Sequence, residues 1–372
     1  MANSAEKTLQ EVLNGFDFGA PVVGAARFGC GHINDTFCVH TQPQDDCCRC
    51  FILQRMSSAA FKHPEQLMAN IIGITDFLGE KIKAAGGDRS REAMEVIRTK
   101  NGEPYYTDSE GGAWRVYPYV TGTYCYQSAE TPALFEASAK AFGKFQKMLC
   151  DYPAETLFEA IPHFHDTEDR LQKLKDAIAA DVMGRVAEVS DEIAFVMERE
   201  KDCSVALQAQ RDGILPLRVT HNDTKLNNVL IDKATGEGLC VIDLDTTMPG
   251  LAINDFGDSI RFGANHSTED EHDLSKVNFD ISLFEAYTRG FLAGADGALT
   301  DAELDYLPWG AKLMTLECGI RFLTDYLSGD TYFRIHYPDQ NLYRCRTQFK
   351  LVRDYEAQWD EMNAVVKKIS GR

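Results

Sequence analysis

The chain has few basic residues for its length. Among its 372 residues, 57 Asp and Glu stand against 38 Lys and Arg, which gives a formal net charge of −19 at pH 7. Nucleic acids and anionic membrane surfaces are bound through an excess of basic side chains, which this sequence lacks. We therefore expect neither kind of partner, although a few local donors would still suffice to bind a single nucleotide.

The sequence also lacks a long apolar run. No stretch of about twenty apolar residues is present, so no transmembrane helix is predicted. The first residues, MANSAEKTLQEVLNGF, have neither the basic nor the apolar segment of a signal peptide. These absences predict a cytoplasmic protein, in which the 11 cysteines would stay reduced. The length fits two lobes or domains.

Three cysteines, Cys47, Cys48 and Cys50, cluster in the segment DDCCRC. Tetrahedral metal sites are usually built from C-x-x-C pairs. Because this spacing differs, we expect the segment to form a hairpin tip and the start of a strand, without a metal.

The most informative stretch is an H-x-D-x-x-x-x-N pattern formed by His221, Asp223 and Asn228. Residues 218–220 predict a short strand that ends at this polar loop. The loop would bring an Asp carboxylate and an Asn carboxamide to one place.

A second carboxylate follows on a hairpin. Two short apolar runs, 229–231 and 239–242, are separated by a polar turn that contains glycine, and Asp243 follows the second run. Oxygen ligands from Asn228 and Asp243 suit Mg²⁺, a hard cation. Asp223 is left to accept a proton from a substrate hydroxyl. These are the parts of kinase-type phosphoryl transfer, which favours an enzyme over a turn held by local hydrogen bonds.

Other acidic residues surround this set. Asp245 lies two positions past Asp243 and points the same way in an extended chain, which adds it to the candidate metal ligands. Asp255 or Asp258 is expected to support the loop through hydrogen bonds, together with His221.

The N-terminal part predicts a small β-rich lobe. Gly29 and Gly31 lie in a turn between two strands and would allow the backbone to approach phosphate oxygens, as in the glycine-rich lid of kinases. The next strand, 50–55, lacks the lysine that kinases carry there, so Arg55 is the candidate phosphate ligand. Apolar spacings of three and four predict a helix over 64–84.

A hinge is expected after three more strands. Strands over 93–98 and 104–107 would flank an Asn-Gly turn. The apolar run 113–120 contains Pro118, which weakens its tail as a strand, and it ends in Thr-Gly-Thr at 121–123. A strand that breaks into a short connector is what a hinge between two lobes needs. The predicted division is an N-lobe over 1–120 with the hinge near 118–123, and a helical C-lobe over 121–372 with the catalytic loop 221–228, the metal hairpin 239–245 and substrate-binding helices.

Two groups of polar residues in the helical part are compatible with a position at the protein surface. His163 and His165 fall in a loop and are expected at its surface. Glu317, Arg321 and Asp325 recur at four-residue steps on one helix face, which suits a surface ion-pair ladder as well as a functional site.

Six segments resemble the aminoglycoside phosphotransferase and choline kinase branch of the protein-kinase-like fold, and within it the N-acetylhexosamine 1-kinases. They are GHINDT (31–36), FILQR (51–55), IPHFHD (161–166), HNDTK (221–225), VIDLDTTMPG (241–250) and GIRFLTDYLSGDTYF (319–333). Together they extend across nearly the whole chain. The resemblance implies an α+β, bilobal protein-kinase-like fold, with a small antiparallel β-sheet N-lobe carrying one main helix and a mostly helical C-lobe.

The resemblance also implies an activity. It points to an ATP- and Mg²⁺-dependent kinase that phosphorylates the anomeric 1-hydroxyl of N-acetylglucosamine or N-acetylgalactosamine. The implied roles are a base for Asp223, neutralisation of phosphate charge or sugar contact for Lys225, metal ligation for Asn228 and Asp243, and sugar binding for Arg321, Tyr332, His32 and Asp35.

Two alternatives stay open. Another small-molecule kinase of the same branch could act on an aminoglycoside, choline, homoserine or methylthioribose. The negative net charge suits a cationic substrate, whereas Lys225 and Arg321 would oppose one. A non-catalytic nucleotide-binding protein is favoured by the missing lysine, but Asp223, Asn228 and Asp243 together argue against it.

Overall fold

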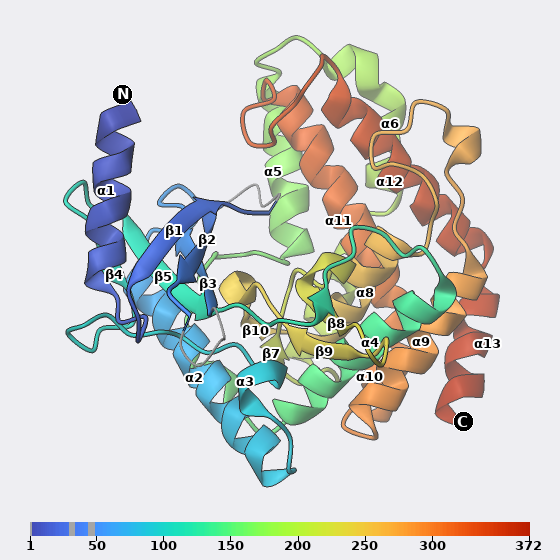
Figure 1. Ribbon diagram of the computed structural model, residues 1–372. Coiled ribbons are helices and arrows are strands. Elements are labelled where there is room, and N and C mark those ends of the chain that lie inside the picture. Colours follow the sequence, from blue (N-terminus) through green and yellow to red (C-terminus); the bar gives the residue numbers. More distant parts are fainter. Residues whose placement is uncertain (1, 30–33, 44–48) are drawn as a thin grey trace. The chain divides into compact units, whose positions relative to one another are not determined.

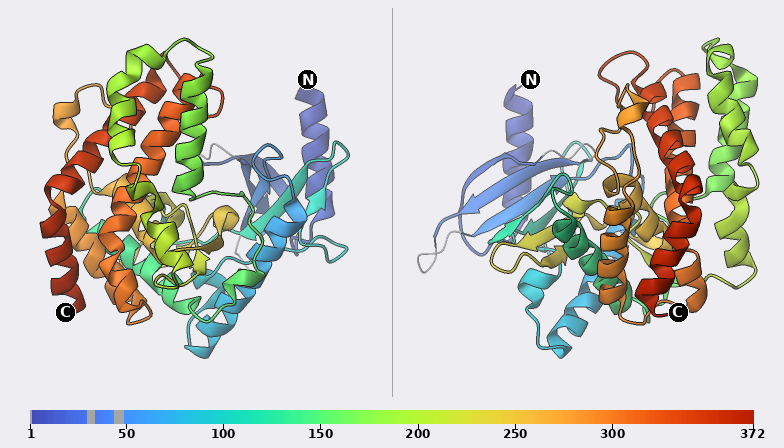
Figure 2. Two further views of the ribbon diagram at one scale, coloured as in Figure 1. Left: turned by 180° about the vertical axis from the view of Figure 1, so that it is seen from behind. Right: turned by 90° about the vertical axis from the view of Figure 1, so that its right-hand side faces the viewer.

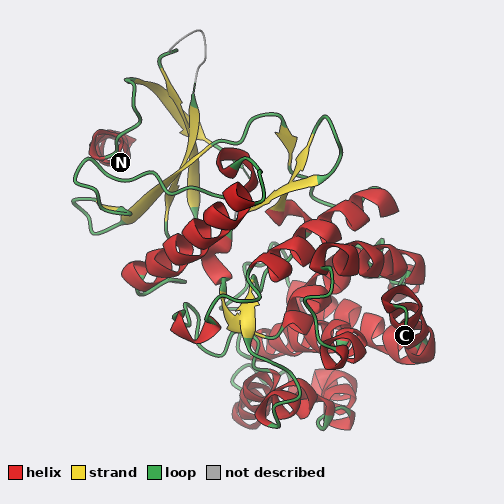
Figure 3. Ribbon diagram, turned by 90° about the horizontal axis from the view of Figure 1, so that it is seen from below, coloured by secondary structure: helices red, strands yellow, loops and turns green. Residues whose placement is uncertain are grey.

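The computed structural model describes residues 2–29, 34–43 and 49–372, and the chain divides into two compact units. Unit 1 comprises Met1–Thr123, Leu157–Ile161 and Leu239–Thr247; unit 2 comprises Tyr124–Thr156, Pro162–Gly238 and Met248–Arg372. Strands are prominent in unit 1, whereas unit 2 is mostly helical (Figures 1 and 3). The segment that carries Asp243 is grouped with unit 1, and the domain boundary near 118–123 stays a prediction.

Unit 1 is built on a five-stranded antiparallel sheet with the strand order β1-β2-β3-β5-β4. The strands are β1 (Val22–Arg27), β2 (Asp35–Thr41), β3 (Cys50–Arg55), β4 (Tyr106–Thr107) and β5 (Ala113–Pro118). Side chains alternate along β3, so Phe51 and Leu53 face one side and Gln54 faces the other. Val12 of helix α1 (Ala2–Gly15) and Phe16, which follows the helix, belong to the same apolar core as Phe51 and Leu53. The second side is left for polar side chains.

Helix α2 (Pro64–Ala84) has the bounds that the apolar spacing predicted, and the prediction is confirmed. Proline at the first helical position has a suitable φ and no N–H to leave unpaired. Asn70 on α2 is buried and exchanges two hydrogen bonds with the backbone of Phe158, at 2.8 and 2.9 Å. These bonds tie the short segment Leu157–Ile161 to α2. The one-turn helix α3 (Arg89–Glu92) follows.

The strand predicted over 93–98 is wrong. This segment makes a single isolated bridge, between Ile97 and Val116. The Asn-Gly turn itself is present, because the N–H of Gly102 donates to the carbonyl of Thr99 at 2.9 Å. After the turn, only Tyr106 and Thr107 pair with β5. The turn therefore does not connect two paired strands, as the hairpin prediction required.

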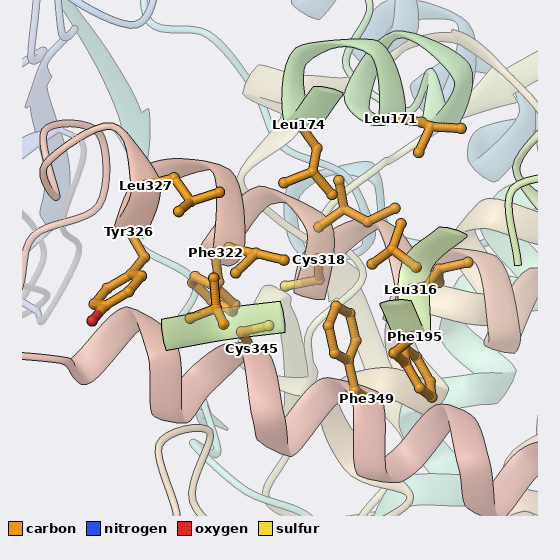
Figure 4. Close-up of a cluster of buried hydrophobic side chains, with 14 of the residues drawn as sticks. Leu171, Leu174, Phe195, Leu316, Cys318, Phe322, Tyr326, Leu327, Cys345 and Phe349 are labelled. Atoms are coloured by element: carbon orange, nitrogen blue, oxygen red, sulfur yellow. The ribbon is translucent and has the colours of Figure 1, made fainter. Parts of the chain in front are cut away.

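Unit 2 consists mainly of helices. They are α4 (Pro132–Met148), α5 (Thr167–Ala180), α6 (Ser190–Glu198), α7 (Val205–Arg211), α8 (Ala252–Gly263), α9 (Ile281–Ala295), α10 (Asp301–Asp305), α11 (Leu307–Leu327), α12 (Gln340–Ala357) and α13 (Trp359–Ser370). The red helices α12 and α13 run beside the orange α11 and α9 (Figure 2). Leu174, Phe195, Leu316 and Phe349 belong to an apolar cluster that joins α5, α6, α11 and α12 (Figure 4). Among the described residues, none of the helices is both long and apolar enough to span a bilayer.

Short strands frame the polar loop of unit 2. Strand β7 (Arg218–Thr220) pairs antiparallel with β10 (Met248–Gly250). After β8 (Val229–Asp232), the N–H of Asp232 donates to the carbonyl of Glu237 at 2.9 Å and closes the predicted turn before β9 (Gly238–Val241). Strand β6 (Thr123–Tyr124) lies earlier in the chain.

Glycines set how closely two helix pairs of unit 2 approach. A Cβ atom at Gly143 of α4 would collide with the carbonyl oxygen of Phe291 in α9. A Cβ atom at Gly257 of α8 would collide with the carbonyl oxygen of Gly310 in α11. Backbone atoms of a helix cannot turn aside as a side chain can. The glycine contact between α8 and α11 therefore fixes the spacing of two helices that carry polar side chains toward the predicted catalytic loop.

We expect Gly257→Ala to destabilise unit 2, because the added methyl group would press on the carbonyl oxygen of Gly310. Overpacking costs about 1–3 kcal/mol of unfolding free energy, against the roughly 1 kcal/mol that alanine gains over glycine in a helix. Urea unfolding followed by circular dichroism measures the change. Gly24→Ala is the control, since its new Cβ would have nothing within 4 Å. An unfolding midpoint for Gly257→Ala at or above that of the wild type would contradict the close packing.

Candidate active site

The predicted catalytic loop follows directly from β7 in unit 2, and Asp255 of α8 holds its backbone. The Asp255 carboxylate accepts hydrogen bonds from the N–H groups of His221 at 2.9 Å and Asn222 at 2.7 Å. Gln146 of α4 donates to the same carboxylate at 2.7 Å. Asn222 has a φ of +65°, a left-handed conformation that Asn tolerates better than most residues. The chain can therefore turn sharply just before Asp223.

The Asp255 side chain is only 1% exposed. Burial raises the pKa of the Asp255 carboxyl above its ordinary value, while the nearby His221 and the donated hydrogen bonds act in the opposite direction. A buried carboxylate without partners would be costly. The backbone and amide donors therefore explain why an acidic residue is tolerated at this position.

His221 is buried and supports the loop from within. Its ring lies edge-on to Phe142 and Phe145, with ring centres 5.5 and 6.0 Å away. Its Nδ1 accepts a hydrogen bond from the N–H of Asp223 at 3.3 Å. His221 thus packs against the helix α4 and contacts the backbone, while the Asp223 side chain faces outward.

The loop brings Asp223, Lys225 and Asn228 together. One carboxylate oxygen of Asp223 lies 2.8 Å from Lys225 Nζ, and the other accepts a hydrogen bond from Asn228 Nδ2 at 3.1 Å. Asn228 Nδ2 also donates to the carbonyl oxygen of Asp223 at 2.8 Å, which orients the amide. Each carboxylate oxygen has a second lone pair. Asp223, whose side chain is 28% exposed, can therefore still accept a proton from an incoming hydroxyl.

Lys225 belongs to a cluster of charges with Asp258 and Arg261 of α8. Arg261 Nε donates to Asp258 at 2.9 Å, and Asp258 also accepts the N–H of Thr224 at 3.1 Å. Burial disfavours the charge on Lys225, but the Asp223 and Asp258 carboxylates outweigh this and raise the pKa of Lys225. Lys225 is therefore fully charged at neutral pH beside Asp223.

His165 supports the same loop, although its sequence pattern predicted a surface position. Its Nε2 lies 3.1 Å from the carbonyl oxygen of Asn222, and its Nδ1 lies 3.0 Å from a carboxylate oxygen of Glu317 in α11. Both partners offer acceptor oxygens, and this arrangement favours the charged imidazole, which carries hydrogen on both ring nitrogens. Glu317 is also buried and accepts the Thr167 hydroxyl at 2.8 Å. The surface position expected for His165 is therefore wrong.

The electrostatic surroundings of His165 agree with this geometry. Burial disfavours its charge, but the hydrogen bond and the negative charge of Glu317 outweigh burial and raise the pKa of His165. Asp258 contributes in the same direction. The charged imidazole can therefore hold the Asn222 carbonyl, while Asp255 accepts the Asn222 N–H.

We expect His165→Gln to destabilise unit 2 most at mildly acidic pH. Because the pKa of His165 is raised on folding, its stabilisation is complete below the ordinary value of 6.5 and is lost as the pH rises through the raised value. The difference in Tm between the wild type and His165→Gln should therefore be largest below about pH 6.5 and shrink as the pH rises above it. His163→Gln, which changes an exposed neighbouring histidine, is the matched control. A difference that grows with pH would contradict the charged imidazole.

Helix α11 and the turn after it bring together two residues predicted to bind substrate. The guanidinium carbon of Arg321 lies 5.8 Å from the ring centre of Tyr332, 5.3 Å from that of Phe333 and 5.9 Å from that of Phe164. Asp325 is buried and accepts the N–H groups of Tyr332 at 2.8 Å and Phe333 at 2.9 Å. Asp325 is thus engaged with this turn rather than with Arg321 in a surface ladder. Tyr332 is 71% exposed and available to a ligand.

Asp243 and Asp245 of unit 1 have different surroundings. Asp243 is exposed and has a φ of +61°, a conformation rare outside glycine and enriched at functional sites. Asp245, in the short 3-10 helix Leu244–Thr246, is buried. It forms an ion pair with Arg115 of β5 and accepts a hydrogen bond from Asn34 at 2.7 Å. Asp245 is therefore held by the sheet, and Asp243 remains as the outward carboxylate.

Arg115 is a charged residue that sequence patterns did not single out. It lies opposite Gln54 in the sheet and donates to the Gln54 side chain through Nε at 3.1 Å and Nη2 at 2.9 Å. Burial disfavours its charge, but Asp245 outweighs this and raises the pKa of Arg115. Arg55, the predicted phosphate ligand, follows Gln54 and faces the other side of the sheet, where its guanidinium lies 5.8 Å from the Trp114 ring centre. An arginine inside the apolar run AWRVYPYV was the available signal for Arg115.

The glycine-rich turn is described only in part. Gly29 has a φ of +78°, and an added Cβ would have nothing within 4 Å, so its backbone is open to approach. Gly31 and His32, predicted to bind nucleotide and sugar, lie outside the described residues. Asp35 accepts a hydrogen bond from Arg27 at 3.0 Å in a largely exposed ion pair. Its predicted contact with substrate stays a prediction.

The available oxygen donors fit a hard divalent cation. Asn228 uses its Nδ2 toward Asp223, which leaves its amide oxygen as the atom to bind a metal. Asp243 supplies an exposed carboxylate. A carboxylate and a carboxamide are ligands that Mg²⁺ takes readily, with water and phosphate oxygens completing its shell. Binding of one ion by both Asn228 and Asp243 stays a prediction.

The kinase-like fold, with an antiparallel sheet in one unit and a helical second unit, is that of a phosphotransferase with a hydroxyl acceptor. Residues 25–296, more than half of the chain, match the phosphotransferase enzyme family, and the chain belongs to that family.

Solved structures with the same fold cover nearly the whole chain. A microcompartment-associated aminopropanol kinase is 16% identical, with a TM-score of 0.61 over 96% of this chain and 98% of that one. An aminoglycoside phosphotransferase from Alicyclobacillus acidocaldarius is 13% identical, with a TM-score of 0.58 over 97% and 95%. An amicoumacin kinase in complex with AMP-PNP, Ca²⁺ and Ami is 15% identical, with a TM-score of 0.57 over 95% and 93%. At these identities the likeness shows the fold.

Proposed function

We propose that this chain is an ATP- and Mg²⁺-dependent kinase that phosphorylates the anomeric 1-hydroxyl of an N-acetylhexosamine. The observation that carries the kinase proposal is the loop in which Asp223 is held by Asn228 and Lys225, in a member of the phosphotransferase family. The amicoumacin kinase of similar fold was solved with AMP-PNP and Ca²⁺. By analogy with that kinase, we propose that this chain also binds a nucleotide and a divalent cation.

In the proposed reaction, Asp223 orients the acceptor hydroxyl and accepts its proton. Lys225, charged at neutral pH, offsets negative charge on the phosphoryl group in transfer. Asn228 and Asp243 would hold Mg²⁺, which would offset the negative charge of the nucleotide phosphates. Phosphoryl transfer asks little covalent chemistry of the protein, so positioning supplies much of the catalysis. His165 and Asp255 supply that positioning through the backbone before Asp223.

Arg321 and Tyr332 support a sugar as the acceptor. Small-molecule sites combine apolar and aromatic surface with a few polar groups that set orientation. The exposed Tyr332 ring would pack against the sugar, and the Arg321 guanidinium would donate to its hydroxyl or acetyl oxygens. A second cation, Lys225, is also proposed at the reaction centre. Two positive charges would disfavour an amine-bearing acceptor.

A kinase acting on a cationic acceptor, such as an amino alcohol or an aminoglycoside, is the second candidate. The net charge of −19 favours it, because a negative protein attracts cationic substrates over long range. Proteins of similar fold include an aminopropanol kinase and an aminoglycoside phosphotransferase. The local charge of Arg321 argues for a neutral sugar instead.

We expect phosphate transfer from ATP and Mg²⁺ to N-acetylglucosamine or N-acetylgalactosamine, with loss of the reducing end of the sugar. Glucose, galactose, choline, aminopropanol and kanamycin complete the panel. Loss of the reducing end reports that the anomeric oxygen carries the phosphate. Transfer to an amine-bearing acceptor alone would keep the kinase and overturn the sugar proposal. No transfer to any acceptor, with ATP still bound, would favour a non-catalytic role.

Asp223→Asn should lower kcat by about 100- to 10,000-fold, the range of a lost general base, while ATP binding is retained. Asp243→Asn should instead weaken Mg²⁺-dependent ATP binding, because it removes a metal ligand. Calorimetric titration of ATP with and without Mg²⁺ separates the two variants. Full turnover by Asp223→Asn would remove Asp223 from the reaction, and unchanged Mg²⁺ dependence in Asp243→Asn would remove Asp243 from the metal site.

A further inference from the structure

Three side chains with metal-binding atoms meet on one face of the unit 1 sheet. Cys38 and His40 are two residues apart on β2 and share a face, and Cys50 of β3 lies directly opposite His40 in the antiparallel register. The ligand atoms of all three lie within 4.8 Å of one another. Cys50 Sγ lies 3.2 Å from His40 Nδ1, and Cys38 Sγ lies 3.6 Å from His40 Nε2.

We propose that Cys38, His40 and Cys50 form a Zn²⁺ site. Two thiolates and one imidazole are ligands that Zn²⁺ prefers, whereas Mg²⁺ prefers oxygen. Tetrahedral Zn²⁺ with sulfur at about 2.3 Å and nitrogen at about 2.0 Å places neighbouring ligand atoms roughly 3.5 to 3.8 Å apart. One ligand atom from each residue lies within 4.8 Å of the others, so small side-chain rotations would bring the three to this spacing. His40 is exposed, so its ring can turn to direct one nitrogen at the ion.

The ligands come from two strands, which is why spacing along the chain did not indicate a metal. The DDCCRC segment lacks a C-x-x-C pair, and only the β2–β3 register brings Cys38 and His40 to Cys50. Three protein ligands leave the fourth position of the ion for water. Cys50 and Gln54 lie four residues apart on the same face of β3. Zinc there would fasten β2 to β3 on the face that also carries Gln54 and Arg115, and its binding energy would add to the stability of unit 1.

The test is a Co²⁺ titration of the full chain in a reductant without thiols, followed by addition of Zn²⁺. We expect one equivalent of Co²⁺ to give a near-ultraviolet thiolate-to-cobalt band and visible bands of a tetrahedral ion, both abolished by Zn²⁺. Asn228 and Asp243 offer only oxygen, so an ion bound by them would give no thiolate band. Metal analysis of the purified protein should find about one zinc per chain.

Cys38→Ser and Cys50→Ser should each weaken Co²⁺ binding by more than roughly 10-fold. Loss of a residue that only supports a metal ligand already lowers metal affinity by about 10-fold or more, and loss of a ligand itself should cost at least as much. His40→Gln keeps both thiolates and should shift the visible bands, which keeps the test informative if a serine variant misfolds. Cys150→Ser, which changes an exposed cysteine of unit 2, is the matched control and should leave the titration unchanged.

Absence of the thiolate band in the wild type would overturn the proposal. So would a band that survives in both Cys38→Ser and Cys50→Ser, because the thiolates would then lie elsewhere. Peptide mapping that finds a Cys38–Cys50 disulfide and no zinc would assign the pair to redox chemistry instead.

Discussion

The predicted catalytic loop depends on one buried carboxylate. Asp255 accepts the N–H groups of His221 and Asn222, two donors that are out of reach of water. Without this acceptor, each buried donor would cost about 1–3 kcal/mol. The left-handed turn at Asn222, just before Asp223, is also stabilised by His165, which contacts the Asn222 carbonyl. The position of Asp223 therefore depends on contacts of the backbone before it, in addition to those that its carboxylate makes with Lys225 and Asn228.

Unit 1 also has a buried acidic residue close along the chain to an exposed one. Asp245 is buried and held by Arg115 and Asn34, while Asp243, two residues earlier, is exposed. A buried ion pair contributes little net stability, yet removing one partner costs about 3–5 kcal/mol because the other charge is left unpaired. Its effect is to fix the segment in one place. In unit 2 the buried Asp255 holds the backbone before the partly exposed Asp223, and in unit 1 the buried Asp245 lies two residues after the exposed Asp243.

Local patterns in the sequence predicted much of the fold and the centre of the site. The helix over 64–84 and the strand over 218–220 have the predicted bounds, because apolar spacing and the flanking breakers lie within the segments themselves. The H-x-D-x-x-x-x-N loop is contiguous, so its members were found together. His165 and Arg115 were missed because their partners, Glu317 and Asp245, lie more than a hundred positions away, and only tertiary packing decides whether a charged residue is buried beside an opposite charge.

The buried ion pair of unit 1 also constrains how phosphate charge can be balanced. Where kinases carry a lysine, this chain has the neutral Gln54, and Arg55 faces the other side of the sheet. Redirecting Arg115 to a phosphate would strip Asp245 of its partner, at a cost of about 3–5 kcal/mol. We infer that Arg115 stays with Asp245, and that Mg²⁺ and Lys225 balance the phosphoryl charge. The raised pKa of Lys225 suits this role, because the amine stays charged throughout the neutral range. The missing lysine then changes which groups neutralise the phosphates, and leaves the proposed base and metal ligands in place.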